Sequence, residues 1–255
     1  RQMCIRYSFT VRDITDFFAA YYQPQNIVLI ITGSFDEQEA LTFGKRIQLS
    51  VLSSAQSATI HYQKFACPSA VTRFLPSNKQ QSFFGRYFCL PVDSLSSALK
   101  LDLFLDSIRY QLVETIRSEA FCYNFDLTAK FYPEAAIIGL EAELASHKII
   151  RLQRLLQQTI NKVNRDFHQR DLQHVKNDKI ISLELDSDYP RVVARELAWQ
   201  YLTYGSVLDY PRQKELLNSF SMADFKKHFR GIFIDGPAHL LVTGKLGRLS
   251  KDSRK

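Results

Sequence analysis

The chain has 255 residues, of which 45% are hydrophobic and 23% charged, and its formal net charge is +7. Such a composition belongs to a globular protein with room for one large domain or two smaller ones. The longest apolar runs, Ile27–Ile31 and Ala135–Leu140, are far too short to cross a bilayer, so no membrane span is expected. No signal peptide opens the chain, which starts at Arg1, and we interpret it as a piece of something longer.

The positive charge is partly local, because basic residues crowd into the last eleven positions. We interpret residues 247–255 as a solvated basic tail. Binding of nucleic acid is the alternative hypothesis for a basic chain, but the sequence has no basic helix interleaved with aromatics and no Gly-rich phosphate loop. We therefore expect no nucleic-acid partner.

Residues 10–33 predict a helix followed by a strand. Thr10 and Asp13 suit the start of a helix, and apolar residues then recur at helical spacing until Pro24 ends it. The continuous apolar run Ile27–Ile31 predicts a strand that is covered on both faces, and Gly33 ends it. A second helix is expected over residues 36–46.

The rest of the chain alternates between strands and helices. The Ser-, Ala- and Gln-rich stretch 49–80 predicts a linker with one strand near 61–65, and Tyr132-Pro133-Glu134 predicts the turn of a hairpin. Strands are expected over 81–91, 121–131, 135–144 and 238–243, and helices over 94–117, 146–165 (capped by Ser146), 170–184, 190–204 and 221–230. Residues 211–219 are expected to form a short segment between the last two helices.

Two segments of the chain echo each other. Residues 10–18 and 221–229 are similar, and each precedes a short connection and an apolar run that ends in Thr-Gly. We interpret residues 1–48 as the C-terminal end of a preceding homologous domain, 49–80 as the linker and 81–246 as a C-terminal domain of the same kind.

A metal site or a complete hydrolase site is not visible in the sequence. The six histidines form neither H-E-x-x-H nor H-x-x-E-H, and there is no Gly-x-Ser-x-Gly elbow. The four cysteines form no C-x-x-C pair, so a zinc knuckle is not expected, and they leave the compartment open.

The most informative stretch joins the long helix to the hairpin, from Arg117 to Tyr123. A cation suits a helix C-terminus and a tyrosine suits a strand, so spacing alone favours a structural role for both residues. The order of motifs, however, resembles the C-terminal part of the pitrilysin and insulin-degrading-enzyme family of zinc metallopeptidases. The motifs are a Ser- and Leu-rich helix start at 96–106, Arg117 and Tyr123, a Trp-containing helix at 194–204, and a helix start at 217–225. Upstream, residues 16–26 and Thr32-Gly33 resemble the ending of the family's preceding domain.

This resemblance implies an α+β fold, in which helices pack on an antiparallel-rich mixed sheet as two layers. It implies that the chain is the zinc-free half of a metalloendopeptidase, inactive alone, with the catalytic zinc in an N-terminal half that would be its partner. Arg117 would hold a substrate carbonyl or backbone, Tyr123 would donate a hydrogen bond to the oxyanion at the scissile bond, and the strand at 121–131 would offer an edge to an extended peptide.

The sequence also departs from the family pattern. Five residues separate Arg117 and Tyr123 where the family has six, and Cys122 stands where the family has glycine. The alternative hypothesis is therefore a non-catalytic structural or partner subunit of the same fold. The resemblance implies a periplasmic or a soluble intracellular location.

Overall fold

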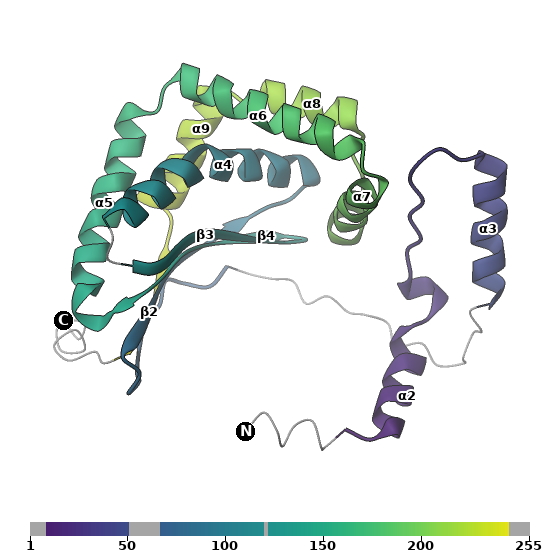
Figure 1. Cartoon of the computed structure of the whole chain (residues 1–255), viewed down its shortest axis with the longest axis horizontal. Helices are drawn as coiled ribbons and strands as arrows, with labels where there is room; N and C mark the ends of the chain where they lie inside the picture. The colour runs from purple at the N-terminus through teal and green to yellow at the C-terminus, as the bar shows by residue number, and fades with distance from the viewer. Residues whose placement is uncertain (1–8, 51–66, 120–121, 245–255) are drawn as a thin grey trace. The chain divides into compact units, whose positions relative to one another are not determined.

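The computed structural model describes residues 9–50, 67–119 and 122–244 (Figure 1). These residues belong to two compact units. Unit 1 takes residues 1–64 and 186–202, and unit 2 takes residues 65–185 and 203–255. The expected basic tail at 247–255 and the expected strand at 61–65 lie outside the described residues.

Unit 2 is built on a five-stranded sheet in the order β1-β5-β2-β4-β3. β5 pairs with β1 in parallel, and the other neighbouring strands pair antiparallel, so the predicted antiparallel-rich mixed sheet is confirmed. The predicted hairpin is also confirmed as β3 and β4. The strands are β1 Thr72–Pro76, β2 Gln81–Pro91, β3 Cys122–Tyr132, β4 Ala135–Ala145 and β5 Ala238–Gly244.

The helices of unit 2 follow the predicted periodicity, and α4 and α5 lie on one face of the sheet (Figure 1). Ser146 does not cap α5, contrary to prediction. It begins a short 3-10 turn, Ser146–Lys148, and its hydroxyl lies 2.6 Å from that of Ser82 on β2. The helices are α4 Leu95–Ser118, α5 Ile149–Asp166, α6 Gln169–Ser187, α8 Tyr210–Ser219 and α9 Met222–Phe229, which continues as a π-helical turn, Arg230–Ile234.

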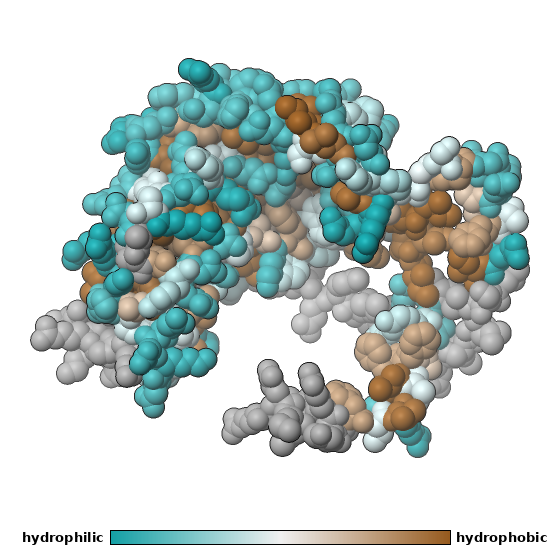
Figure 2. Space-filling model, viewed as in Figure 1, coloured by the Kyte–Doolittle hydropathy of each residue, from teal (hydrophilic) through white to brown (hydrophobic). Residues whose placement is uncertain are grey.

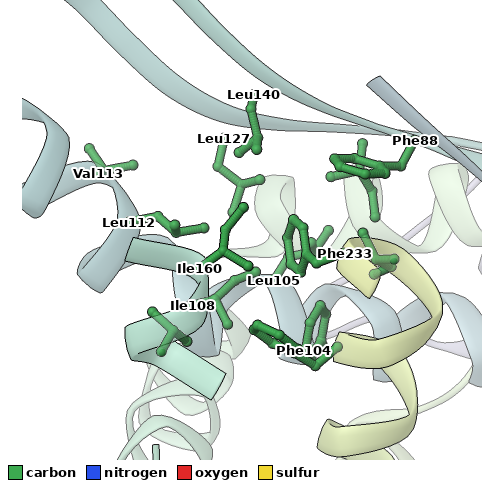
Figure 3. Close-up of a cluster of buried hydrophobic side chains, with 14 of the residues drawn as sticks. Phe88, Phe104, Leu105, Ile108, Leu112, Val113, Leu127, Leu140, Ile160 and Phe233 are labelled. Carbon is green, nitrogen blue, oxygen red and sulfur yellow. The ribbon is translucent and has the colours of Figure 1, made fainter. Parts of the chain in front are cut away.

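The core of unit 2 fills the space between the sheet and these helices. Leu127 and Leu140 project from β3 and β4 toward Leu112 and Ile108 of α4 (Figure 3). All four side chains are at most 1% exposed. Burying a side chain of this size contributes about 1.5–3 kcal/mol, and this apolar layer therefore holds α4 against the hairpin.

The segment predicted as a linker contains structure that the sequence did not suggest. β1, at Thr72–Pro76, lies within it and pairs with β5, which is distant in the sequence. A disulfide joins Cys67 to Cys89 of β2. The sequence did not indicate β1 or this cross-link, because long-range pairing and a disulfide supply order that a polar composition does not show.

In unit 1, the predicted helices are present as α2 Val11–Tyr21 and α3 Glu37–Ser50, and α7 Pro190–Tyr204 begins in this unit. The predicted strand at Ile27–Ile31 is wrong, since these residues have no regular structure. A strand needs a neighbour for its backbone hydrogen bonds, and no described strand pairs with this run. Apolar side chains of α2 and α3 are exposed as well, and brown atoms gather over these helices in Figure 2.

The sequence echo between the two units is also a structural one. Thr10 and Asp13 form a capping box at the start of α2, and Ser221 and Asp224 form another at the start of α9. The same number of residues leads from each cap to a glycine with positive φ, which is Gly33 at 125° and Gly244 at 138°. The apolar residues of α9 are buried, whereas those of α2 are exposed.

Candidate functional site

Tyr123 lies in a β-bulge at the beginning of β3. Cys122 pairs with Leu144 and Asn124 pairs with Glu143, so Tyr123 is an extra residue without a partner position on β4. A bulge disrupts the ladder locally and redirects a side chain, and bulges are common beside active sites. The Tyr123 side chain is 70% exposed, so the predicted phenol is presented to its surroundings and not packed into the core.

Arg117, the other predicted site residue, projects from the last turn of α4 to the same strand. Its Nη2 donates a hydrogen bond of 3.3 Å to the carbonyl oxygen of Phe125. The guanidinium group has five N–H donors, so this bond uses only part of its capacity. The structure therefore brings Arg117 and Tyr123 to one end of β3, with Arg117 bound to the strand's own backbone.

Arg109 is a contributor that the sequence analysis missed. It lies eight positions before Arg117 on α4, and its Nη1 donates a hydrogen bond to the carbonyl oxygen of Leu127. It also lies 3.6 Å from Asp106 and 3.9 Å from Asp126 in two ion pairs. Two positions eight apart lie near one face of a helix, which is the only signal in the sequence that could have linked these arginines.

These two arginines matter because β3 is an edge strand of the sheet as described. The carbonyls of Phe125 and Leu127 each accept a hydrogen bond from one of the two arginine side chains. Unpaired edge groups are a template for adding a further strand. An incoming peptide would therefore have to replace the arginine contacts at these two positions.

Cys122 precedes Tyr123 and is a free thiol in the described part of the chain. Its burial raises the pKa of the thiol, and Lys148 opposes this shift. Since the nucleophilic form of cysteine is the thiolate, a raised pKa makes Cys122 a poor nucleophile at neutral pH. We assign it no chemical role.

The face of the sheet opposite α4 and α5 carries a compact polar cluster. The Tyr87 ring lies over two glycines, because a Cβ on Gly85 would come within 2.5 Å of the ring and one on Gly139 within 2.9 Å. Burial, followed by the charge and hydrogen bond of Glu141, raises the pKa of Tyr87 to about 12. Tyr87 is thus a neutral hydrogen-bonding group on this face at physiological pH.

A zinc ion does not fit the described residues, among which no group of three His, Cys, Asp or Glu side chains could hold a metal. None of the described helices is long and apolar enough to cross a bilayer. The site therefore offers the phenol of Tyr123 on β3 and two guanidinium groups from α4 that contact this strand, and all three groups can donate hydrogen bonds.

Among solved structures, the chain is similar in fold to a protease from Helicobacter pylori, with a TM-score of 0.75, 16% identity, and coverage of 93% of this chain and 59% of that chain. It is also similar to a chain of complex III2 from Candida albicans, with a TM-score of 0.71, 13% identity, and coverage of 94% and 60%. A third similar structure is the periplasmic protease PqqL from Escherichia coli, with a TM-score of 0.65, 15% identity, and coverage of 83% of this chain and 24% of that chain. The chain thus spans less than two thirds of each of these proteins. No curated protein matches it.

A family model supplies the closer assignment. The model described as the peptidase M16 inactive domain matches residues 8–179, which is more than half of the chain. This stretch contains α4, the bulge and the hairpin, so it includes Arg117 and Tyr123. The chain belongs to the family of the peptidase M16 inactive domain.

Proposed function

We propose that this chain is the zinc-free half of a zinc metalloendopeptidase, which encloses and orients peptide substrates that a zinc-bearing half hydrolyses. The observation that carries this proposal is the position of Tyr123, which is exposed in a bulge at the edge of β3. Bulges are over-represented next to active sites, where they redirect a side chain. The inactive-domain match supports the assignment of the zinc to another part of the assembly.

In this proposal Tyr123 donates a hydrogen bond from its phenol to the oxygen that becomes negative at the scissile carbonyl. A fixed donor aimed at developing charge in a closed site contributes about 10²–10³ in rate. The phenol belongs to this chain, so it reaches the reacting carbonyl only when the two halves close around the peptide. Hydrolysis then depends on closure.

Arg117 binds the substrate backbone in the same proposal. Its contact with the Phe125 carbonyl shows that it can reach and donate to a main-chain oxygen in this position. A peptide lying along β3 presents the same chemical group. Main-chain recognition of this kind gives affinity with little sequence preference.

The domain organisation follows from the echo between the units. We propose that residues 1–48 end a preceding homologous domain, whose other residues would cover the apolar run Ile27–Ile31. The matching capping boxes and positive-φ glycines support this. Hydrogen exchange tests it, since backbone amides at 27–31 should be protected in the longer parent protein and exchange fast in this chain alone. Equal, fast exchange in both would contradict it.

The location we favour is an oxidising one such as the periplasm. The disulfide Cys67–Cys89 supports this, because disulfides persist in oxidising compartments and are rare in the cytosol. Peptide mapping of the protein from its native source, with free thiols blocked at lysis, tests it. Recovery of both cysteines as blocked thiols would refute it.

The function is tested with the parent protein, or with this chain combined with its zinc-bearing half. We expect hydrolysis of a fluorogenic peptide that stops on addition of a chelator and returns with zinc, and none with this chain alone. Hydrolysis that continues at the same rate in the presence of the chelator would contradict the metallopeptidase assignment.

The second candidate is a non-catalytic subunit of the same fold. It is favoured by the fold similarity to a chain of complex III2 and by the departure from the family spacing at Cys122. In that case the same assembly would bind its partner but show no peptidase activity with zinc present.

A further inference from the structure

Arg86 is a charged residue on the apolar, helix-covered face of a central strand. β2 lies between β4 and β5, and Arg86 is in register with Leu140 on one side and Leu240 on the other. Its neighbours two positions away, Phe84 and Phe88, share its face and are each 1% exposed. A cation in these surroundings loses part of its hydration, which is unfavourable unless a partner replaces the lost water.

Such a partner is not found in the described part of the chain. Arg86 has no ion pair and no hydrogen-bond acceptor there, and its guanidinium carbon lies 5.2 Å from the centroid of the Phe88 ring. Burial lowers the pKa of Arg86 below its usual value. The aromatic contact offsets part of the lost hydration, but it leaves the N–H donors in the guanidinium plane to be satisfied by something else.

The guanidinium group opens into a cavity of about 300 Å³ between the sheet and α5. Its polar wall is made of Arg86, Gln153 and Gln157, and its apolar wall includes Phe84, Leu156 and Leu240. The volume is at the lower end of the range for small-molecule sites, and an apolar cavity with a few polar groups on one side is typical of them. Gln153 adds amide N–H donors to this wall, and Gln157, whose Nε2 donates to Asn161 at 3.2 Å, keeps one further N–H.

We propose that this cavity binds a carboxylate carried on a short apolar group, with Arg86 as its anchoring cation. The planar guanidinium pairs with a carboxylate through two parallel hydrogen bonds, while the apolar wall contacts the attached group. Two sources have this chemistry, namely the C-terminal residue of a peptide and a short fatty acid. The cavity lies on the helix-covered face of the sheet, so the proposal is independent of Tyr123 and of peptidase activity.

The binding test compares three probes by calorimetry at constant ionic strength: N-acetyl-leucine, octanoate, and N-acetyl-leucinamide, which lacks the charge. We expect at least one of the two acids to saturate the protein with a Kd near 1 mM or below, and the amide to bind at least about tenfold more weakly. Tighter binding of N-acetyl-leucine identifies a peptide C-terminus as the source, and tighter binding of octanoate identifies a fatty acid. Equal binding of acid and amide, or no saturation by either acid, would overturn the proposal.

Two substitutions test whether the acid binds in this cavity. Arg86→Met keeps an unbranched apolar side chain like the arginine stem and removes the charged guanidinium, so the acid should bind at least about tenfold more weakly with the melting temperature unchanged or raised. Gln153→Glu supplies a carboxylate from the protein itself, and should raise the melting temperature and block the acid. The matched control is Gln158→Glu, which adds the same charge to an exposed position of α5. If Arg86→Met binds like the wild type, or Gln153→Glu like the control, the acid binds elsewhere.

Discussion

Replacement of the two α4 arginines that donate to β3 is the sharpest test of how this edge strand is stabilised. Arg109→Gln and Arg117→Gln together delete the hydrogen bonds to the carbonyls of Leu127 and Phe125. A buried hydrogen bond from a charged group contributes about 1.5–3 kcal/mol. Both arginines are partly or largely exposed, so we expect about 0.5–1 kcal/mol for each after solvent screening.

The double variant should therefore lose about 1–2 kcal/mol, which lowers the melting temperature by about 2–8 °C for a unit of this size. It should also self-associate in sedimentation velocity, because its edge carbonyls become available to another strand. Arg165→Gln is the control, since Arg165 pairs with its neighbour Asp166 at 2.7 Å and is 74% exposed. A double variant as stable and as monodisperse as this control would refute the reasoning.

Three further predictions concern unit 2. Lys179 donates to Asp102 and Asp106 at 2.7 Å each. Lys179→Met leaves the two carboxylates without their shared cation and should lower the free energy of unfolding in urea by about 2–3 kcal/mol. A decrease as small as that caused by replacing an exposed lysine would contradict this. Burial lowers the pKa of His228, so the unfolded state binds more protons than the folded state at acidic pH. The free energy of unfolding should therefore fall as the pH drops from about 6.5, and it should fall less in His228→Gln. The same dependence of this free energy on pH in both proteins would exclude His228 as the cause. Reduction of the Cys67–Cys89 disulfide should cost about 2–4 kcal/mol, and an unchanged unfolding midpoint with dithiothreitol would argue against a structural role.

Local patterns predicted most elements of unit 2, because apolar residues of a helix or strand recur with its own period. The helix α4 and the hairpin β3–β4 are examples, and both lie where the sequence places them. Features that depend on distant parts of the chain were not predicted. β1 has a mostly exposed sequence and is a strand because it pairs with β5.

The run Ile27–Ile31 shows the opposite error. Its composition is that of a buried strand, but composition cannot supply the neighbouring strands that its backbone requires. At the candidate site, the sequence indicated Arg117 and Tyr123 through a family resemblance and not through spacing. The bulge at Tyr123, the contact of Arg109 with β3 and the pairing of Cys67 with Cys89 all depend on three-dimensional proximity.

The most direct measurement is the kinetics of Tyr123→Phe in the assembly that contains zinc. Tyr110→Phe is the matched control, because Tyr110 is 75% exposed and Tyr123 is 70% exposed. The loss of one phenolic hydroxyl at Tyr123 should lower kcat by about tenfold or more with a modest change in KM, while the control keeps the kcat of the wild type. Equal kcat values for the two variants would remove Tyr123 from the reaction and contradict the proposed function of this half.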